Sequence, residues 1–324
     1  MTNYGSAIRE GFSYLLNNYK EVFTIGQGLW SPWYVGNTMT DLDKEFGKDR
    51  VIDTPVSELA TTGAALGAAL CGKRPIVIHP RVDFGLLAVD QIVNQAAKWA
   101  HMFGGDIPLP LVVRMIVNRG GEQGAQHSQS LHSWFAHIPG LRVVIPSTPT
   151  DARDLLIAAS LGNNPVVYMD DRWLYDLEED LPPIQVNSLD DECPKIVKPG
   201  SDLTIVGCGF TTRLSINAAD QLSKLGIESE IIDLRVINPL KCETIIESVS
   251  KTGRLVVVDG DWENCGIAGE VIAQVTTKIE LGKLKANPAR ITLPSAPAPT
   301  SKVLEEIYYI SDKAIVDRVI DMMK

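Results

Sequence analysis

The chain has 324 residues, of which 45% are hydrophobic and 22% charged, and its formal net charge is −10. This length predicts two domains, each large enough to bury its own core. The acidic balance and the lack of a basic cluster exclude nucleic acid and an anionic membrane surface as expected partners, and no apolar run reaches transmembrane length. Five cysteines without a CxxC pair, and an N-terminus without a signal-peptide core, predict reduced thiols in a cytoplasmic protein.

Strands and helices alternate through the first half of the chain. A helix is predicted over residues 4–18, because Ile8, Phe12, Leu15 and Leu16 fall on one face. Strands are predicted at 22–25, 51–52, 76–78, 110–115, 142–145 and 166–169, and further helices from 58, over 84–100, from 127 and from 149. Such alternation predicts parallel βαβ units, whose strands end at one edge of the sheet. The loops at 26–40, 53–58, 79–84 and 116–128 should therefore meet there.

A second alternation of strands and helices follows a segment of different composition. Residues 181–200 contain prolines and lose periodicity, which predicts a domain connection. Strands are predicted at 203–206, 228–234, 255–258 and 291–293, and helices at 212–224, 240–250, 268–280 and 311–323. The sequence thus predicts an α/β protein of two three-layer α/β/α domains with mainly parallel sheets, at residues 1–180 and 201–324, joined by 181–200.

One acidic residue stands out in the first domain. Glu58 begins a helix of Ala, Gly, Thr and Leu that carries no charge between Leu59 and Cys71, so the helix should be buried over most of its surface. A first-turn glutamate is favoured by the helix dipole. A desolvated carboxyl has a raised pKa and suits general acid–base work. The spacing alone leaves both interpretations open.

Histidines and a second acidic group are further candidates. His127 follows the glycine-rich loop 118–126 at a predicted helix start, where a packing role competes with a catalytic one. His132 and His137 show no metal-ligand spacing and are interpreted as structural. The acidic residues of 259–263 follow a strand, and a solvated strand end is favoured over a cation site.

A series of longer motifs carries a family resemblance. In chain order these are DTPVSE at 53–58, AVDQIVNQAAK at 88–98, QHSQS at 126–130, AHIPGLRVVIPSTPTDARDLL at 136–156, NNPVVY at 163–168, EIIDLRVINPL at 230–240 and KTGRLVVVDGDWENCGIAGEV at 251–271. Together they resemble the beta subunit of the thiamine-diphosphate-dependent first component of 2-oxoacid dehydrogenase complexes, of the pyruvate or branched-chain type. The resemblance covers essentially the whole chain and implies a transketolase-like pyrimidine-binding domain followed by a transketolase C-terminal domain.

The resemblance also implies roles for individual residues. Glu58 would bond N1′ of the cofactor aminopyrimidine and promote the proton transfer that activates the cofactor. Val56 would line the pyrimidine pocket and Phe84 would pack on the ring. His127 would lie near the reacting carbon and assist acyl transfer to a lipoyl group. A structural potassium ion is implied at Leu111, Ala159, Ser160, Gly162 and Asn164, largely through backbone carbonyls.

A partner chain is implied as well. The sequence lacks the GDG signature, followed about thirty residues later by Asn, with which the family binds magnesium and diphosphate. An alpha subunit would therefore supply Mg²⁺ and the diphosphate site in an α2β2 assembly, and a lipoyl acyltransferase component would receive the acyl group. Gly63 and Gly67, four residues apart on the Glu58 helix, would face a second subunit.

Two departures from the family pattern keep alternatives open. Gln27 stands where typical members carry an acid, and residues 79–82 replace a usual apolar run. One alternative is a split thiamine enzyme of a specialised pathway with a non-lipoyl acceptor. Another is a scaffold without catalysis, which the retained Glu58, Phe84 and His127 argue against.

Overall fold

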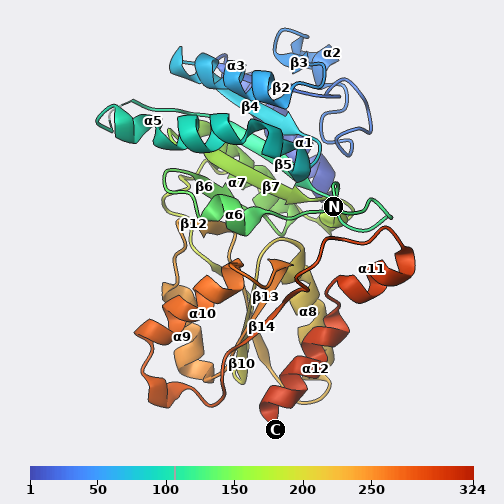
Figure 1. Cartoon of the computed structure of the whole chain (residues 1–324), viewed down its shortest axis with the longest axis vertical. Helices are drawn as coiled ribbons and strands as arrows, with labels where there is room; N and C mark the ends of the chain where they lie inside the picture. Colours follow the sequence, from blue (N-terminus) through green and yellow to red (C-terminus); the bar gives the residue numbers. More distant parts are fainter. Residues whose placement is uncertain (106) are drawn as a thin grey trace.

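The structure is a computed structural model that describes residues 1–105 and 107–324. Two α/β units stack end to end along the long axis of the molecule, with the N-terminal unit at the top of Figure 1 and the C-terminal unit below it. Each unit has a central, mainly parallel sheet between two layers of helices. The predicted α/β class with two three-layer units is confirmed.

A seven-stranded sheet forms the centre of the first unit. Its order is β12-β6-β7-β5-β4-β2-β3, and all pairs are parallel except β12 with β6. The strands are β2 (Val22–Gly26), β3 (Val51–Asp53), β4 (Arg74–His79), β5 (Val112–Val117), β6 (Arg142–Val144), β7 (Val166–Asp171) and β12 (Val236–Asn238). Strands β4, β5 and β7 are buried along nearly their whole length because both faces of the sheet are covered.

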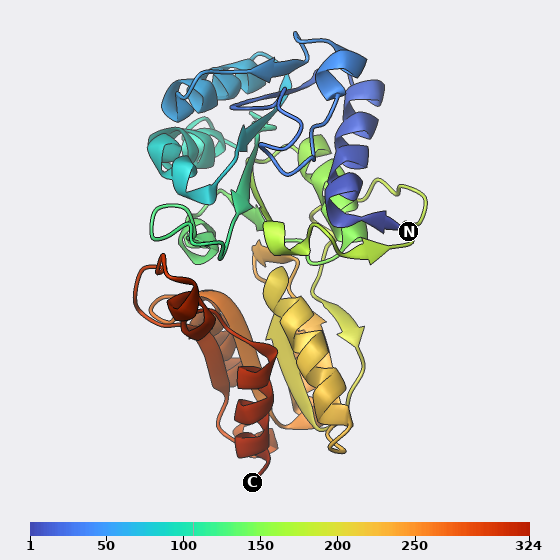
Figure 2. The same ribbon diagram turned by 90° about the vertical axis from the view of Figure 1, so that its right-hand side faces the viewer.

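Helices cover the two faces of this sheet in pairs. Helices α1 (Tyr4–Asn18) and α7 (Pro149–Leu161) pack on one face, and α3 (Glu58–Leu70) lies on the other with the segment 82–102 (Figure 2). Helix α7 begins as its sequence predicts, since the Thr148 side chain accepts the Asp151 N–H and Pro149 occupies the first turn. Small elements complete the unit, namely β1 (Thr2–Asn3), which pairs with β8 (Glu178–Glu179), α2 (Leu42–Phe46) and η3 (Arg172–Leu174).

One of two further predicted helices is present and the other is not. Residues 82–102 are helical without a break, as predicted for 84–100, although the hydrogen-bond pattern changes along them, from α4 (Val82–Gly85) through η1 (Leu86–Ala88) and a π-helical η2 (Asp90–Ala96) to α5 (Ala97–Met102). The prediction of a helix that begins at His127 is wrong, because α6 spans His132–Ala136 and residues 127–131 are non-helical. Leu131 adopts a left-handed conformation, with φ of 54°, immediately before the helix.

The second unit repeats the three-layer plan. Its sheet order is β14-β13-β10-β11-β9, parallel except for β9 with β11. The strands are β9 (Lys195–Lys198), β10 (Leu203–Gly207), β11 (Ser229–Asp233), β13 (Leu255–Trp262) and β14 (Ala289–Leu293). Helices α8 (Phe210–Ser223) and α12 (Asp312–Met323) cover one face, and α9 (Glu243–Thr252) and α10 (Ile267–Lys278) cover the other. The turn η4 (Leu281–Lys283) and α11 (Lys302–Tyr308) flank this sheet, and β9 falls within the segment predicted as a connection.

The two units share structure at their junction. Strand β12 lies downstream of β11 in the chain but adds to the edge of the first sheet, against β6. One hydrophobic cluster runs without interruption from α3 and the first sheet to α9 and α10. Among the described residues, no helix is long and apolar enough to cross a membrane.

Candidate active site at the strand ends

Glu58 lies in a narrow recess at the carboxyl edge of the first sheet. It is the first residue of α3 and only 8% exposed. Gln27, after β2, and His79, at the end of β4, line the same recess. The recess lining contains no lysine or arginine. The predicted buried carboxylate is therefore present, and no cation of the recess lining neutralises it.

Helix α3 itself is less buried than its sequence predicts. Thr61, Thr62 and Ala65 face the interior, while Leu59, Ala60 and Ala64 are exposed. A Cβ added at Gly67 would meet nothing within 4 Å. The apolar helix therefore presents an open face of small residues on the outside of this chain.

His79 is a buried neutral side chain beside this carboxylate. Burial lowers the pKa of His79 to about 4, so its imidazole is uncharged at neutral pH. Its Nε2 lies 3.3 Å from Oγ1 of Thr62, one turn along α3 from Glu58. The histidine thus ties the end of β4 to the Glu58 helix.

Phe84 and His127 lie together at this edge of the sheet. Both are half-buried, and their rings meet edge to face with centroids 5.5 Å apart at an angle of 86°. Phe84 comes from α4 after β4, and His127 comes from the loop after β5. Val56, in the loop before Glu58, is 66% exposed and does not line the Glu58 recess.

The loop that carries His127, residues 118–131, is held by both units. On the first unit, Gln129 donates from its backbone N and its Nε2 to Oδ1 of Asp83, at 3.3 and 2.8 Å. On the second unit, Glu305 Oε1 accepts the Glu122 N–H at 2.9 Å, and the Ser130 hydroxyl donates to the Gly260 carbonyl at 2.8 Å. Burial raises the pKa of Asp83, while its bonds to Gln129 and the nearby His127 lower it in part.

The five residues predicted to hold potassium gather at the opposite end of the sheet. Four lie at the end of α7 or just after it, and Leu111 lies beside them before β5. The Arg74 guanidinium donates to the carbonyl oxygens of Ser160 and Gly162, at 3.1 and 2.7 Å. Each carbonyl retains a second lone pair, and oxygen donors suit a hard cation.

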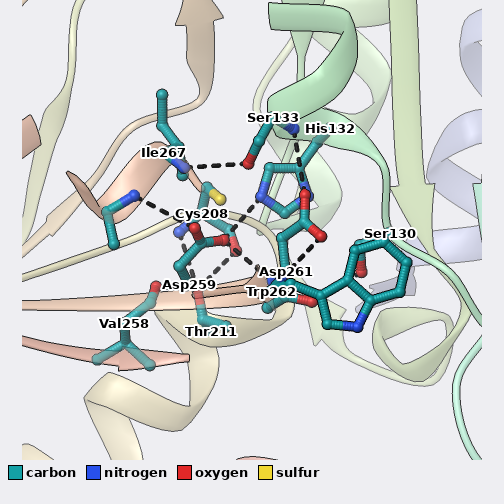
Figure 3. Close-up of polar contacts among 12 residues, drawn as sticks. Ser130, His132, Ser133, Cys208, Thr211, Val258, Asp259, Asp261, Trp262 and Ile267 are labelled. Atoms are coloured by element: carbon teal, nitrogen blue, oxygen red, sulfur yellow. Dashed lines mark hydrogen bonds and ion pairs between the residues drawn. The ribbon is translucent and has the colours of Figure 1, made fainter. Parts of the chain in front are cut away.

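A second buried polar group joins the units, and it corrects the interpretation of residues 259–263 (Figure 3). Asp259 and Asp261 are buried rather than solvated, and Nε2 of His132 donates to Oδ1 of Asp259 at 2.8 Å. Burial alone would lower the pKa of His132, but the carboxylates of Asp259 and Asp261 raise it above its usual value. The adjacent Ser133 hydroxyl accepts the Ile267 N–H at 3.0 Å. His132 is structural, as predicted, but it has the carboxylate partner that its sequence context does not reveal.

Three residues at the site have no predicted role: His79, which the sequence marks only as a departure from the family pattern, Asp83 and Gln129. Gln129 lies inside the QHSQS motif two residues after His127, and Asp83 directly precedes Phe84 in the loop 79–84 that is predicted to reach this edge. Their pairing spans 46 residues and needed the fold to become visible.

Two family models match the chain. The transketolase pyrimidine-binding domain matches residues 1–176, and the transketolase C-terminal domain matches residues 194–315. A split-gene transketolase, solved as an inactive beta4 tetramer, superposes with a TM-score of 0.78 at 19% identity, covering 99% of this chain and 98% of that one. This likeness concerns the fold alone.

Curated relatives are similar over most of their length. The beta subunit of an acetoin:2,6-dichlorophenolindophenol oxidoreductase from Cupriavidus necator is 45% identical over 276 residues, which is 85% of this chain and 81% of that protein. A subunit of the same name from Bacillus subtilis is 36% identical over 98% of this chain and 96% of that protein. The beta subunit of the human mitochondrial pyruvate dehydrogenase E1 component is 36% identical over 93% of this chain and 84% of that protein.

Proposed function

The chain belongs to the family that joins a transketolase pyrimidine-binding domain to a transketolase C-terminal domain, and on this premise we propose that it is the beta subunit of a thiamine-diphosphate-dependent 2-oxoacid dehydrogenase. With an alpha subunit it would decarboxylate a 2-oxoacid and transfer the acyl group to a lipoyl group. The observation that carries the proposal is the buried Glu58 in a recess without a lysine or arginine in its lining, at the same edge of the sheet as the Phe84–His127 contact.

The residues at this edge fit the aminopyrimidine half of the cofactor. Bound thiamine diphosphate supplies the electron sink for decarboxylation. Glu58 would lie opposite the pyrimidine N1′, where its carboxyl would exchange a proton with the ring. Phe84 packs on the ring, Val56 borders it once a partner covers the open edge, and His127 assists the acyl transfer.

We propose that the alpha subunit covers the open face of α3. Leu59, Ala60 and Ala64 are exposed there, and Val56 and Leu87 extend the apolar surface beside the site. Surfaces of this kind mark interfaces with other chains. The alpha subunit would bring the magnesium ion and the diphosphate site in an α2β2 assembly, and a lipoyl acyltransferase would be the next component. All five cysteines are free thiols, in keeping with a cytoplasmic enzyme.

We also propose a structural potassium ion at the end of α7. The donors would be backbone carbonyls among Leu111, Ala159, Ser160, Gly162 and Asn164. Two of these oxygens already accept bonds from Arg74, so the ion would share them with the guanidinium. Its effect would be on stability, because the corner lies away from the strand ends that carry Glu58.

Acetoin cleavage is the second candidate function. It is favoured by the relative at 45% identity, whose name specifies acetoin and a dye acceptor, whereas the pyruvate dehydrogenase subunits are 36–37% identical. Gln27, where typical family members carry an acid, sits in the Glu58 recess and distinguishes this site locally.

The test is co-expression with the alpha subunit and assay of four combinations. Pyruvate or branched-chain 2-oxoacids and acetoin are each offered with a dye and with a lipoyl domain as acceptor. Turnover of a 2-oxoacid with the lipoyl domain supports the first function. Turnover of acetoin alone replaces it with the second, and turnover of 2-oxoacids with the dye but with no lipoyl domain contradicts the proposed acceptor.

A further inference from the structure

The loop 118–131 is held by both units. Its bonds to Glu305 and Gly260 fix it to the second unit. On the first unit, Arg119 at the start of the loop donates to Asp171, and near His127 the loop is bound through Gln129 to Asp83. Next to the Phe84 ring, the Asp83 carboxylate is therefore the group that holds the His127 end of the loop on the first unit.

Asp83 has the burial and the position needed to hold the loop that carries His127. It is 7% exposed and belongs to α4, the element that also carries Phe84. One oxygen, Oδ1, accepts both the backbone and the side-chain N–H of Gln129. The two bonds together fix both the orientation of the Gln129 backbone and its distance from Asp83. Hydrogen bonds to a charged acceptor are stronger than neutral ones.

The second carboxylate oxygen of Asp83 makes no comparable contact. Oδ2 of Asp83 is buried without a hydrogen-bond partner among the described residues, and so is Oγ of Ser128, which adjoins His127. The two hydrogen bonds that Asp83 accepts from Gln129 therefore both end on Oδ1.

We infer that Asp83 is a positioning residue for His127, holding it through Gln129 so that the imidazole stays edge-on to Phe84. This inference rests on the proposed function for the role of His127, and on the two hydrogen bonds from Gln129 to Asp83 for the clamp itself. Asp83 touches neither substrate nor cofactor in this assignment. Its effect should therefore fall on acyl transfer, where His127 acts, more than on decarboxylation, where Glu58 acts.

The experiment compares four variants of the full chain, alone and with the alpha subunit. D83A removes both bonds to Gln129, and D83N keeps an acceptor oxygen in place. Q129A removes only the side-chain bond. D90A is the matched control, because Asp90 accepts an amide N–H from Asn94 at 2.8 Å on the same segment but is exposed.

Hydrogen exchange of the isolated chain tests the clamp without any activity. D83A should raise exchange of the amides at 127–131 about tenfold, Q129A less, and D83N and D90A within about twofold of the parent. Unchanged exchange in D83A would overturn the inference.

Activity of the complex tests the positioning role. D83A should lower acyl transfer to a lipoyl domain about tenfold while dye-coupled decarboxylation stays within about twofold, and D83N should restore most of the transfer. Equal loss of both activities in D83A would reduce Asp83 to a structural residue and contradict the inference. If the parent complex turns over no 2-oxoacid, the proposed function fails, and the exchange data still decide the clamp.

Discussion

Two buried histidines show how differently the two polar regions of this protein are built. His79 lies in the Glu58 recess, where no lysine or arginine is present and burial lowers its pKa to about 4. His132 lies at the junction of the two units, where burial also acts on it but Asp259 and Asp261 raise its pKa. The same side chain is therefore neutral in one place and favoured as a cation in the other.

The difference lies in the acid beside each histidine. The junction pairs opposite charges and ties strand β13 to helix α6, a structural use of charge. The recess keeps one carboxylate, Glu58, among neutral groups. Buried charge thus joins the units in one region, whereas in the other region the acid has no cation in the recess lining, as its proposed role in cofactor activation requires.

The strongest test of the recess is the replacement of its acid. Glu58→Gln should lower turnover of the complex by about 10²–10⁴-fold, the usual contribution of a general acid–base group. The matched control is Glu243→Gln, since Glu243 also begins a helix but is exposed. Steady-state turnover with thiamine diphosphate in excess measures both. A Glu58→Gln complex as active as the parent would end the assignment.

The strongest test of the junction is the removal of its negative partner. Asp259→Asn should lower the free energy of unfolding by about 3–5 kcal/mol, because it leaves a buried imidazolium without its counter-ion. Denaturant unfolding measures the change. Glu263→Gln, in an exposed pair with Arg290, is the control and should stay within about 1 kcal/mol of the parent. Similar losses of unfolding free energy in Asp259→Asn and Glu263→Gln would show that burial adds nothing to the stability of the His132–Asp259 pair.

A fall in pH should lower the stability of the protein through His79, the neutral histidine of the recess. The folded pKa of His79 lies below the unfolded value of about 6.5, so the unfolded state binds more protons between these values. The stability of the protein should fall as the pH drops from about 6.5 to 4, with up to about 3 kcal/mol from this residue. His79→Gln should flatten that part of the stability curve, and an unchanged slope would contradict the pKa assignment.

A rise in pH should lower the stability of the protein through His132, the charged histidine of the junction, which is the opposite pH dependence. A raised folded pKa means that the stability from His132 is fully present below the unfolded value of about 6.5 and is lost as the pH rises through the folded pKa. His132→Gln should remove this alkaline loss and leave the acid slope of His79 in place. Thermal unfolding scanned across pH separates the two. An alkaline loss that survives in His132→Gln would assign it to another group.

The smallest expected effect concerns potassium. Exchange of KCl for choline chloride at equal ionic strength should lower the melting temperature by about 2–4 °C, if the ion contributes about 1 kcal/mol by binding the folded state. Sodium chloride serves as the second control. No difference among the three salts would show that Arg74 alone satisfies the carbonyls at the end of α7.

Local patterns predicted much of the fold, because hydrophobic period and capping act over a few residues. Helix α1, the start of α7 and the buried acid of α3 followed from spacing alone. The helix over 82–102 was predicted as well, but its changes between α, 3₁₀ and π hydrogen bonding were not, because each stretch is shorter than the window in which a period can be recognised. The His132–Asp259 pair and the Asp83–Gln129 clamp join residues 127 and 46 positions apart, and nothing local in the sequence marks such partners.

The position of strand β12 has a consequence for folding during translation. The first sheet lacks its last strand until residue 238 has been synthesised, so during translation β6 waits with an unpaired edge while the next unit emerges. A chain cut within 181–200 would keep that edge permanently and expose a strand to other chains. The first sheet is therefore complete only when part of the second half of the chain is present.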